Sequence, residues 1–181
     1  MRPPALDIPF TVLMTTLTPF RIPVADLVRR PGASRSVHVA APLADMGVLG
    51  SAVPADEPIT ADLTFEQVSE GIVVRGEITA PWSSPCSRCI KPVRGTTSVH
   101  VDELYERSPL DGETYPLEDD IVDLELLVRD SLLLELPKVP LCRDDCQGLC
   151  ANCGADRNIT TCECATDEVD PRWAALRTLD L

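Results

Sequence analysis

The sequence predicts an α+β fold in which a curved antiparallel β-sheet, or partial barrel, is covered by helices and followed by a cysteine-rich C-terminal segment. Three observations predict it. Much of residues 34–105 alternates apolar and polar side chains, residues 123–136 carry leucines at helical spacing, and six of the eight cysteines fall within residues 142–164.

From these patterns we expect three parts of the chain. Residues 1–19 form an N-terminal extension, residues 20–140 form the α+β body, and residues 141–181 form the cysteine-rich segment and a tail helix. A chain of 181 residues buries enough surface to need no disulfides for stability.

The strands are expected in order along the body. Residues 20–30 alternate loosely and stop at a Pro-Gly turn, and residues 34–41 form the first clear strand. Residues 44–58, rich in Gly, Pro, Ala and Asp, are expected to be a long loop. Residues 59–68 and 72–80 then alternate on either side of a short connection, which predicts a hairpin.

The rest of the body continues this pattern and then changes to a helix. Residues 81–85 (PWSSP) are expected to break the strand and to deliver a C-x-x-C turn, after which residues 93–105 resume as a strand. A polar loop is expected at 106–120. Residues 123–136 predict a helix, with Asp123 as its cap, Leu124, Leu127, Val128, Leu132 and Leu136 on its apolar side, and Pro137 at its end.

The charge is concentrated in one part of the chain. The net charge is −13, and residues 101–136 contribute twelve acidic residues against two arginines. A protein that binds RNA directly would be expected to carry a basic patch, because phosphate neutralisation supplies most non-specific affinity. One local basic group remains, Arg75, Arg88, Lys91 and Arg94, around the first cysteine pair.

Targeting and membrane signals are weak. No apolar run reaches the roughly 18 residues of a membrane span. Residues 10–17 are the one candidate for a signal segment, but Thr-Pro-Phe follows in place of a small-residue cleavage site. We therefore expect a cytoplasmic, reducing location, where clustered cysteines favour metal over disulfides.

The cysteines form four close pairs, and eight thiolates are enough for two tetrahedral zinc sites. Proximity in sequence groups the last two pairs in one local site and joins the first two in another, which would clamp the C-terminal segment onto the sheet. The candidate ligands are Cys86, Cys89, Cys142, Cys146, Cys150, Cys153, Cys162 and Cys164. We expect one or two structural zinc sites.

Three other roles use cysteines in similar patterns. Eight is also a suitable number for four disulfides, although Cys162 and Cys164 cannot easily pair with each other. A thioredoxin-like role for Cys86 and Cys89 would need a helix N-terminus, whereas this pair is expected between strands. Iron–sulfur ligation also suits four thiolates and stays open.

These motifs together resemble the YceD family, the large ribosomal RNA subunit accumulation proteins. The resemblance rests on CSRC at 86–89, the Leu-rich helix, LCRDDCQGLCANCGADRN at 141–158, CEC at 162–164 and DPRWAALRTL at 170–179, where Asp170-Pro171 is typical of a helix start. It implies a role in accumulation of 23S rRNA and in large-subunit assembly.

The resemblance implies no reaction, and the sequence contains no G-x-S-x-G, no phosphate-binding Gly loop and no H-E-x-x-H. We therefore expect a non-enzyme. Its acidic stretch favours a basic ribosomal protein or a pre-50S particle as partner, with rRNA contacted directly or indirectly and no small-molecule substrate or membrane. The alternative is a zinc protein that binds rRNA directly and acts in its processing or stability.

Overall fold

The structure is a computed structural model, and it describes residues 18–109, 112–164 and 172. Its elements, in chain order, are β1 (Arg21–Pro23), α1 (Ala25–Val28), β2 (Ser34–Ala41), β3 (Gly47–Val48), β4 (Ser51–Ala52), β5 (Ile59–Gln67), β6 (Ile72–Pro85), β7 (Pro92–Glu106), β8 (Tyr115–Glu118), β9 (Ile121–Asp123) and α2 (Leu124–Glu135).

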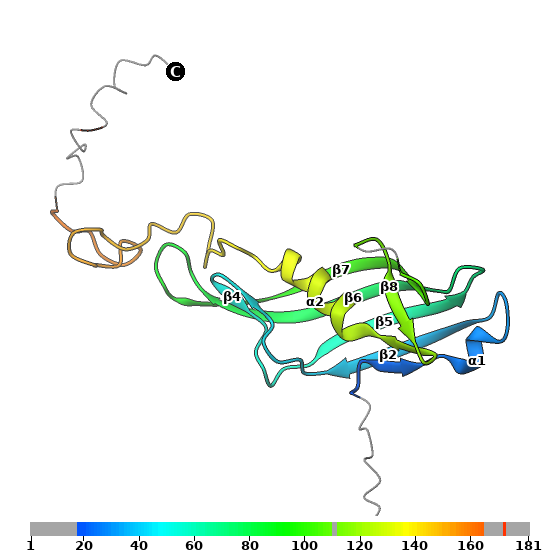
Figure 1. Cartoon of the computed structure of the whole chain (residues 1–181). Helices are drawn as coiled ribbons and strands as arrows, with labels where there is room; N and C mark the ends of the chain where they lie inside the picture. Colours follow the sequence, from blue (N-terminus) through cyan, green and yellow to red (C-terminus); the bar gives the residue numbers. More distant parts are fainter. Residues whose placement is uncertain (1–17, 110–111, 165–171, 173–181) are drawn as a thin grey trace, which may run out of the picture.

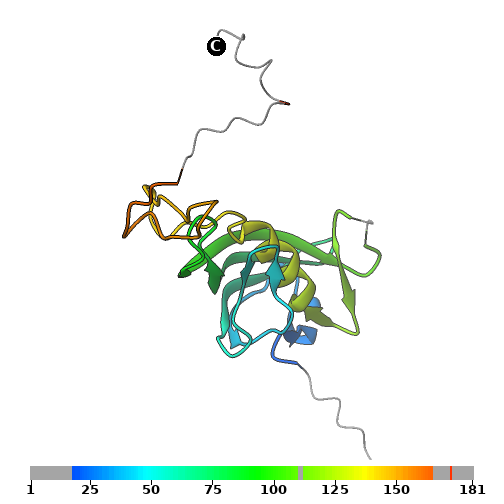
Figure 2. The same ribbon diagram turned by 90° about the vertical axis from the view of Figure 1, so that its left-hand side faces the viewer.

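Hydrogen bonds join the nine strands into one sheet. The order runs β1-β9-β8-β7-β6, and β6 is long enough to pair with β5 along one part and with β4 along another. β2 then pairs with β5, and β3 with β4. Every pair is antiparallel except β7 with β8. The sheet curls into an open half-barrel around α2 (Figures 1 and 2), which confirms the predicted fold class, although the helices cover only a modest part of the sheet.

Alternation along the strands builds the core. In β5, Ile59, Ala61, Leu63 and Phe65 are all buried, and the residues between them are exposed or half-buried. Because successive side chains of a strand point to opposite faces, these four side chains lie on one face of β5, which lines the concave side of the half-barrel. The predicted hairpin of β5 and β6 is confirmed, and its turn is closed by the Val68 amide donating to Gly71 O at 2.9 Å.

Helix α2 fills the concave side. Its stripe of Leu124, Leu127, Val128 and Leu132 is fully buried. The Asp123 carboxylate accepts a hydrogen bond from the Glu125 amide at 3.0 Å, so the predicted cap is confirmed. The predicted helix 123–136 thus forms over 124–135, with Asp123 and Leu136 as its caps. In the described ranges no helix is long and apolar enough to cross a membrane.

The expected break at residues 81–85 is wrong. β6 continues through Pro81 and Pro85 and pairs with β7 as far as Pro92. Its pairing with β5 ends at Thr79, and β4 pairs with it at Ser83 alone. Most of this part of β6 therefore has an open edge, where a proline without an N–H is tolerated.

Two expected loops also contain strands. The segment 44–58 holds the short hairpin of β3 and β4, and the segment 106–120 holds β8. These strands are two to four residues long, too short to produce a visible periodicity. The loosely alternating residues 20–30 form β1 and α1. The predicted tail helix at 170–179 lies outside the described residues, apart from Arg172.

Candidate metal centre

The first cysteine pair lies at the tip of a projecting two-stranded ribbon. β6 and β7 pair over almost their whole length, and in β7 no residue from Pro92 to His100 is buried, so this strand of the ribbon lies at the surface and the turn projects from the sheet (Figure 1). The tip is a tight turn in which Cys86 N donates to Lys91 O at 2.7 Å and Ile90 N donates to Cys86 O at 2.9 Å. The predicted position of this pair, on a turn between strands, is confirmed.

The second pair reaches the tip from the end of α2. The chain leaves the helix at Pro137, and the amide of Ser87 donates to Pro140 O at 2.9 Å. The Cys142 amide then donates to the Cys86 sulfur at 3.4 Å. Residues separated by more than 50 positions in the sequence are thereby brought into one cluster.

Cys86, Cys89, Cys142 and Cys146, here called the inner tetrad, have their four sulfurs within 4.8 Å of one another. The sulfurs of Cys86 and Cys146 are 3.9 Å apart, and those of Cys89 and Cys142 are 3.6 Å apart. A tetrahedral ion about 2.3 Å from each sulfur would separate the sulfurs by about 3.8 Å. The inner tetrad therefore has the size that a single tetrahedral ion requires, and three of its four cysteines are buried.

Cys150, Cys153, Cys162 and Cys164, here called the outer tetrad, form a second group that meets the same 4.8 Å limit. This group is built from local chain. Cys150 N donates to Ala155 O at 2.8 Å and Gly154 N donates to Cys150 O at 2.9 Å, which folds the C-x-x-C-G turn. Only Cys150 is buried, so the outer tetrad is the more exposed of the two.

The thiols of each tetrad differ in acidity. Burial raises the pKa of Cys86, but hydrogen bonds from the amides of Arg88, Cys89 and Cys142 outweigh it and bring the pKa to about 6. The Cys89 thiol and burial raise the pKa of Cys142 to about 12. At neutral pH this tetrad therefore holds a thiolate at Cys86 that can bind a metal ion first, while the thiol of Cys142 stays protonated until the ion displaces its proton.

The outer tetrad repeats this division. Hydrogen bonds from the amides of Cys153 and Asn152 lower the pKa of Cys150 to about 6. The thiols of Cys153 and Cys150 raise the pKa of Cys164 to about 12.

The two tetrads are joined through a small set of polar contacts. Leu149 N donates to Arg88 O at 3.0 Å. The side-chain nitrogen Nδ2 of Asn158 donates to the Cys146 sulfur at 3.6 Å. Lys91 forms an ion pair with Asp156 at 2.7 Å. That ion pair and the hydrogen bonds from Asn158 hold the pKa of Asp156 down at about 2. The outer tetrad is thus attached to the turn that carries the inner one.

These joining residues were not found from the sequence. Asp156 and Asn158 are spaced as in an ordinary turn, and the backbone amide of Asn158 donates to the Asp156 carboxylate at 2.9 Å. Their long-range partners, Lys91 and Cys146, follow only from the three-dimensional arrangement. Sequence spacing gave no signal for them.

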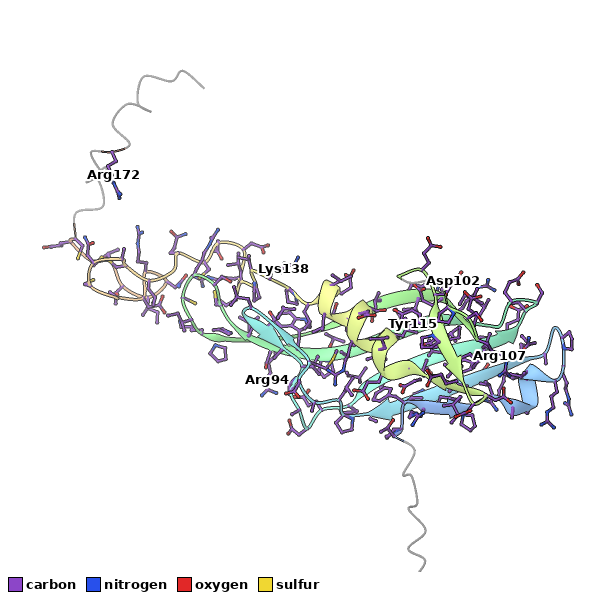
Figure 3. The ribbon with its side chains drawn as sticks, viewed as in Figure 1. Arg94, Asp102, Arg107, Tyr115, Lys138 and Arg172 are labelled. Atoms are coloured by element: carbon purple, nitrogen blue, oxygen red, sulfur yellow. The ribbon has the colours of Figure 1, made fainter. Side chains whose placement is uncertain are left out.

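The basic group expected around the first cysteine pair is only partly assembled, and its members are engaged. Arg75 lies at the other end of β6, paired with Asp102 at 2.9 Å, so its inclusion was wrong. The Arg88 guanidinium donates to Cys146 O at 2.9 Å. Arg94 pairs with Glu57 at 3.3 Å, and Figure 3 places it toward the cysteine-rich end, away from Asp102.

The fold and the site together define a class of small proteins in which a curled β-sheet carries two four-thiol sites in series at one end. The comparisons with known proteins give the family. The family model described as "Large ribosomal RNA subunit accumulation protein YceD" matches residues 74–180, and the chain belongs to this YceD family.

Its relatives include bacterial and plastid proteins. The protein Rv2926c of Mycobacterium tuberculosis is 36% identical over 168 residues, which cover 88% of this chain and 80% of the relative. YlbN of Bacillus subtilis is 30% identical over 66% of this chain and 70% of its own length. A chloroplast protein of Arabidopsis thaliana, named large ribosomal RNA subunit accumulation protein YCED homolog 1, is 32% identical over 36% of this chain and 20% of its own length. No solved structure matches the chain.

Proposed function

We propose that this protein is a non-catalytic ribosome biogenesis factor that supports the accumulation of 23S rRNA in the cytoplasm. It acts by binding a basic ribosomal protein, alone or within a large-subunit assembly intermediate. Membership of the YceD family supports the link to large-subunit rRNA. The observation that carries the proposed mode of action is the acidic charge of residues 101–136.

Much of that charge is not neutralised within the protein. Four of the acidic side chains form ion pairs with arginines: Asp102, Asp120, Asp123 and Glu125. The other seven acidic residues of this range that the structure describes have no ion-pair partner among the described residues: Glu103, Glu106, Glu113, Glu118, Asp119, Asp130 and Glu135. They lie on β7, β8, α2 and the connections between them. A field of one sign speeds association with a partner of opposite charge and repels phosphate.

We further propose zinc as the ion of both tetrads. The sulfur separations of 3.6 and 3.9 Å suit one tetrahedral ion. An iron–sulfur cluster places several irons between the cysteines and would hold their sulfurs farther apart. Bound zinc would stabilise the attachment of residues 141–164 to the β6–β7 ribbon.

The absence of catalysis is part of the proposal. A zinc ion held by four thiolates keeps no open coordination position for water or substrate, so it supplies folding free energy and no Lewis-acid chemistry.

The test is depletion of the protein, with complementation. Cells lacking it should contain less 23S rRNA relative to 16S rRNA, and the wild-type gene should restore the ratio. Tagged protein captured from lysate at low salt should carry a ribosomal protein with a strongly basic sequence, and this should be lost at high salt. Capture of rRNA with no ribosomal protein would contradict the proposal.

The alternative of direct rRNA binding has one observation in its favour, namely that Arg88, Lys91 and Arg94 lie on or next to one exposed turn. Arg94→Glu is the cleanest test, because the side chain of Arg94 is 76% exposed and its partner Glu57 is also at the surface. If rRNA is bound here, this reversal should abolish ultraviolet crosslinking to rRNA while the tetrads stay intact. Unchanged crosslinking would remove the alternative.

A further inference from the structure

Two hollows lie side by side on the acidic part of the surface. The larger, of about 420 Å³, is bordered by β7, α2, β8 and the turn before β8. The smaller, of about 160 Å³, is bordered by β1, β8, β9 and α2. Tyr115, Pro116 and Leu126 line both hollows, so these three side chains form a ridge between them, here called the 115–126 ridge.

The linings of both hollows are acidic. Glu103, Glu113 and Asp130 line the larger hollow, which contains no Lys, Arg or His among its described lining residues. Burial and the neighbouring Asp102 raise the pKa of Glu103, as expected of a carboxylate without a cation beside it. Glu118 and Asp123 line the smaller hollow, where Arg21 pairs with Asp123 at 3.5 Å.

The ridge is apolar and held in place. Leu126 points away from the buried stripe of α2 and is 49% exposed. The ring of Tyr115 stacks on buried Tyr105 with their centroids 5.1 Å apart, and its hydroxyl donates to Asp130 at 3.2 Å. Burial and the Asp130 charge raise the pKa of Tyr115 to about 12, so the phenol stays a donor at neutral pH. A fixed surface of this kind needs little ordering when a ligand binds.

The chemistry of the lining selects among ligands. A divalent cation would need several carboxylate oxygens converging on one point, and in the described part of the chain the only convergent groups are the two cysteine tetrads. RNA would be repelled by the unneutralised carboxylates. Arg and Lys side chains fit both features, since their alkyl stems cover apolar surface while their charged heads reach carboxylates.

We propose that the two hollows and the 115–126 ridge form the docking groove for an extended, basic segment of a protein partner, with Arg or Lys side chains entering the hollows and an apolar side chain resting against Leu126. This inference rests on the proposed function and names the part of the acidic surface that recognises the partner. Tyr115 lies beside α2, away from the cysteine-rich end (Figure 3), so the groove can be altered without touching the tetrads.

The experiment uses the full-length, metal-loaded protein and a fluorescein-labelled peptide of alternating arginine and leucine, with binding followed by anisotropy. The groove variant is Glu103→Gln, Glu113→Gln, Asp130→Asn. The control variant is Asp56→Asn, Glu70→Gln, Glu77→Gln, which removes the same charge from exposed positions outside the groove. We expect the groove variant to lose about tenfold in affinity and the control less than about twofold, because close carboxylate pairs add to the long-range field.

A third variant separates contact from field. Leu126→Ala changes no charge but removes the half-exposed apolar side chain that the peptide is proposed to contact. It should lower the affinity for the peptide several-fold and leave the salt dependence of binding unchanged.

Equal losses in the groove and control variants, or no loss in Leu126→Ala, would overturn the groove while leaving the proposed function standing. If the wild-type protein failed to bind the peptide at low salt, both the groove and the proposed binding of basic proteins would be wrong.

Discussion

At the scale of single residues, the cysteines were predictable and their attachments were not. The C-x-x-C spacings of Cys86 and Cys150 indicate tight turns whatever the fold, and the structure gathers all eight thiols in the two groups that proximity favoured. That they bind metal stays a prediction. The lack of space for a side chain at Gly148, by contrast, is caused by a residue distant in the sequence, because the carbonyl of Arg88 lies close to its Cα.

A comparison of Gly148 with Gly154 tests whether the close approach of the Arg88 carbonyl affects stability. Both have left-handed φ, +71° and +73°, but a Cβ at Gly148 would lie 2.9 Å from Arg88 O, whereas one at Gly154 meets nothing within 4 Å. Gly154→Ala should cost about 1–2 kcal/mol from backbone strain alone. Gly148→Ala should cost more, because the Arg88 turn must move.

The measurement is thermal unfolding of both metal-loaded variants, with bound metal quantified. Equal destabilisation would show that the contact between Gly148 and Arg88 contributes nothing.

At the scale of elements, periodicity located the long strands and the helix but missed features that depend on pairing. β5, β7 and α2 form within one or two residues of their predicted bounds, because each is long enough to repeat its pattern. β6 extends through Pro85 because β7 pairs with it that far while β5 does not, which leaves an open edge where a proline is tolerated. The sequence alone does not show which strands are neighbours. β8 pairs in parallel with Tyr105 and Glu106, but it is only four residues long, too short to give a periodic signal.

Two leucines of α2 test whether its stripe carries the stability of the half-barrel. Leu132 is fully buried and Leu134 is 75% exposed. Leu132→Ala should lower the free energy of unfolding by about 2–5 kcal/mol through lost burial and a cavity. Leu134→Ala, the same change two residues away, should alter it by less than about 0.5 kcal/mol. Urea unfolding of both variants gives the comparison, and similar losses would mean that α2 is not seated as described.

At the scale of the whole molecule, sheet and tetrads are arranged along one axis. The half-barrel could be predicted in outline from alternating strands followed by a helix. The place of the inner tetrad beside the sheet followed from the predicted grouping of the cysteines, but the contacts that attach it could not be predicted, because they depend on where the segment after α2 meets the β6–β7 turn. That meeting joins Ser87 to Pro140 and fixes the inner tetrad at the tip of the ribbon.

Metal binding by the whole protein should depend on pH. The pKa values of Cys142 and Cys164 are raised to about 12, so both thiols are protonated at neutral pH without metal and must lose their protons on binding. Affinity should therefore fall as pH falls, by about tenfold per pH unit for each proton displaced.

Competition with a chromogenic chelator at pH 7 and pH 6, with proton release followed in weak buffer, measures this dependence. A variant with Cys162→Ser and Cys164→Ser isolates the inner tetrad. Affinity that does not change with pH would rule out displacement of protons from these thiols.

Because the outer tetrad is attached to the protein beside the inner one, oxidation of a cysteine should have different effects in the two tetrads. In the described residues, the contacts that hold the outer tetrad include those of Arg88, Lys91 and Cys146, and Asn158 also accepts hydrogen bonds from Arg143 and Gln147; all five residues lie on or beside the inner tetrad. Oxidation of Cys162 or Cys164 would thus stay local, whereas oxidation of the exposed Cys142 would disturb the inner tetrad, beside which all of these contacts lie. The half-barrel and its acidic surface take no part in these contacts, so either oxidation would leave them in place and change only the cysteine-rich end of the molecule.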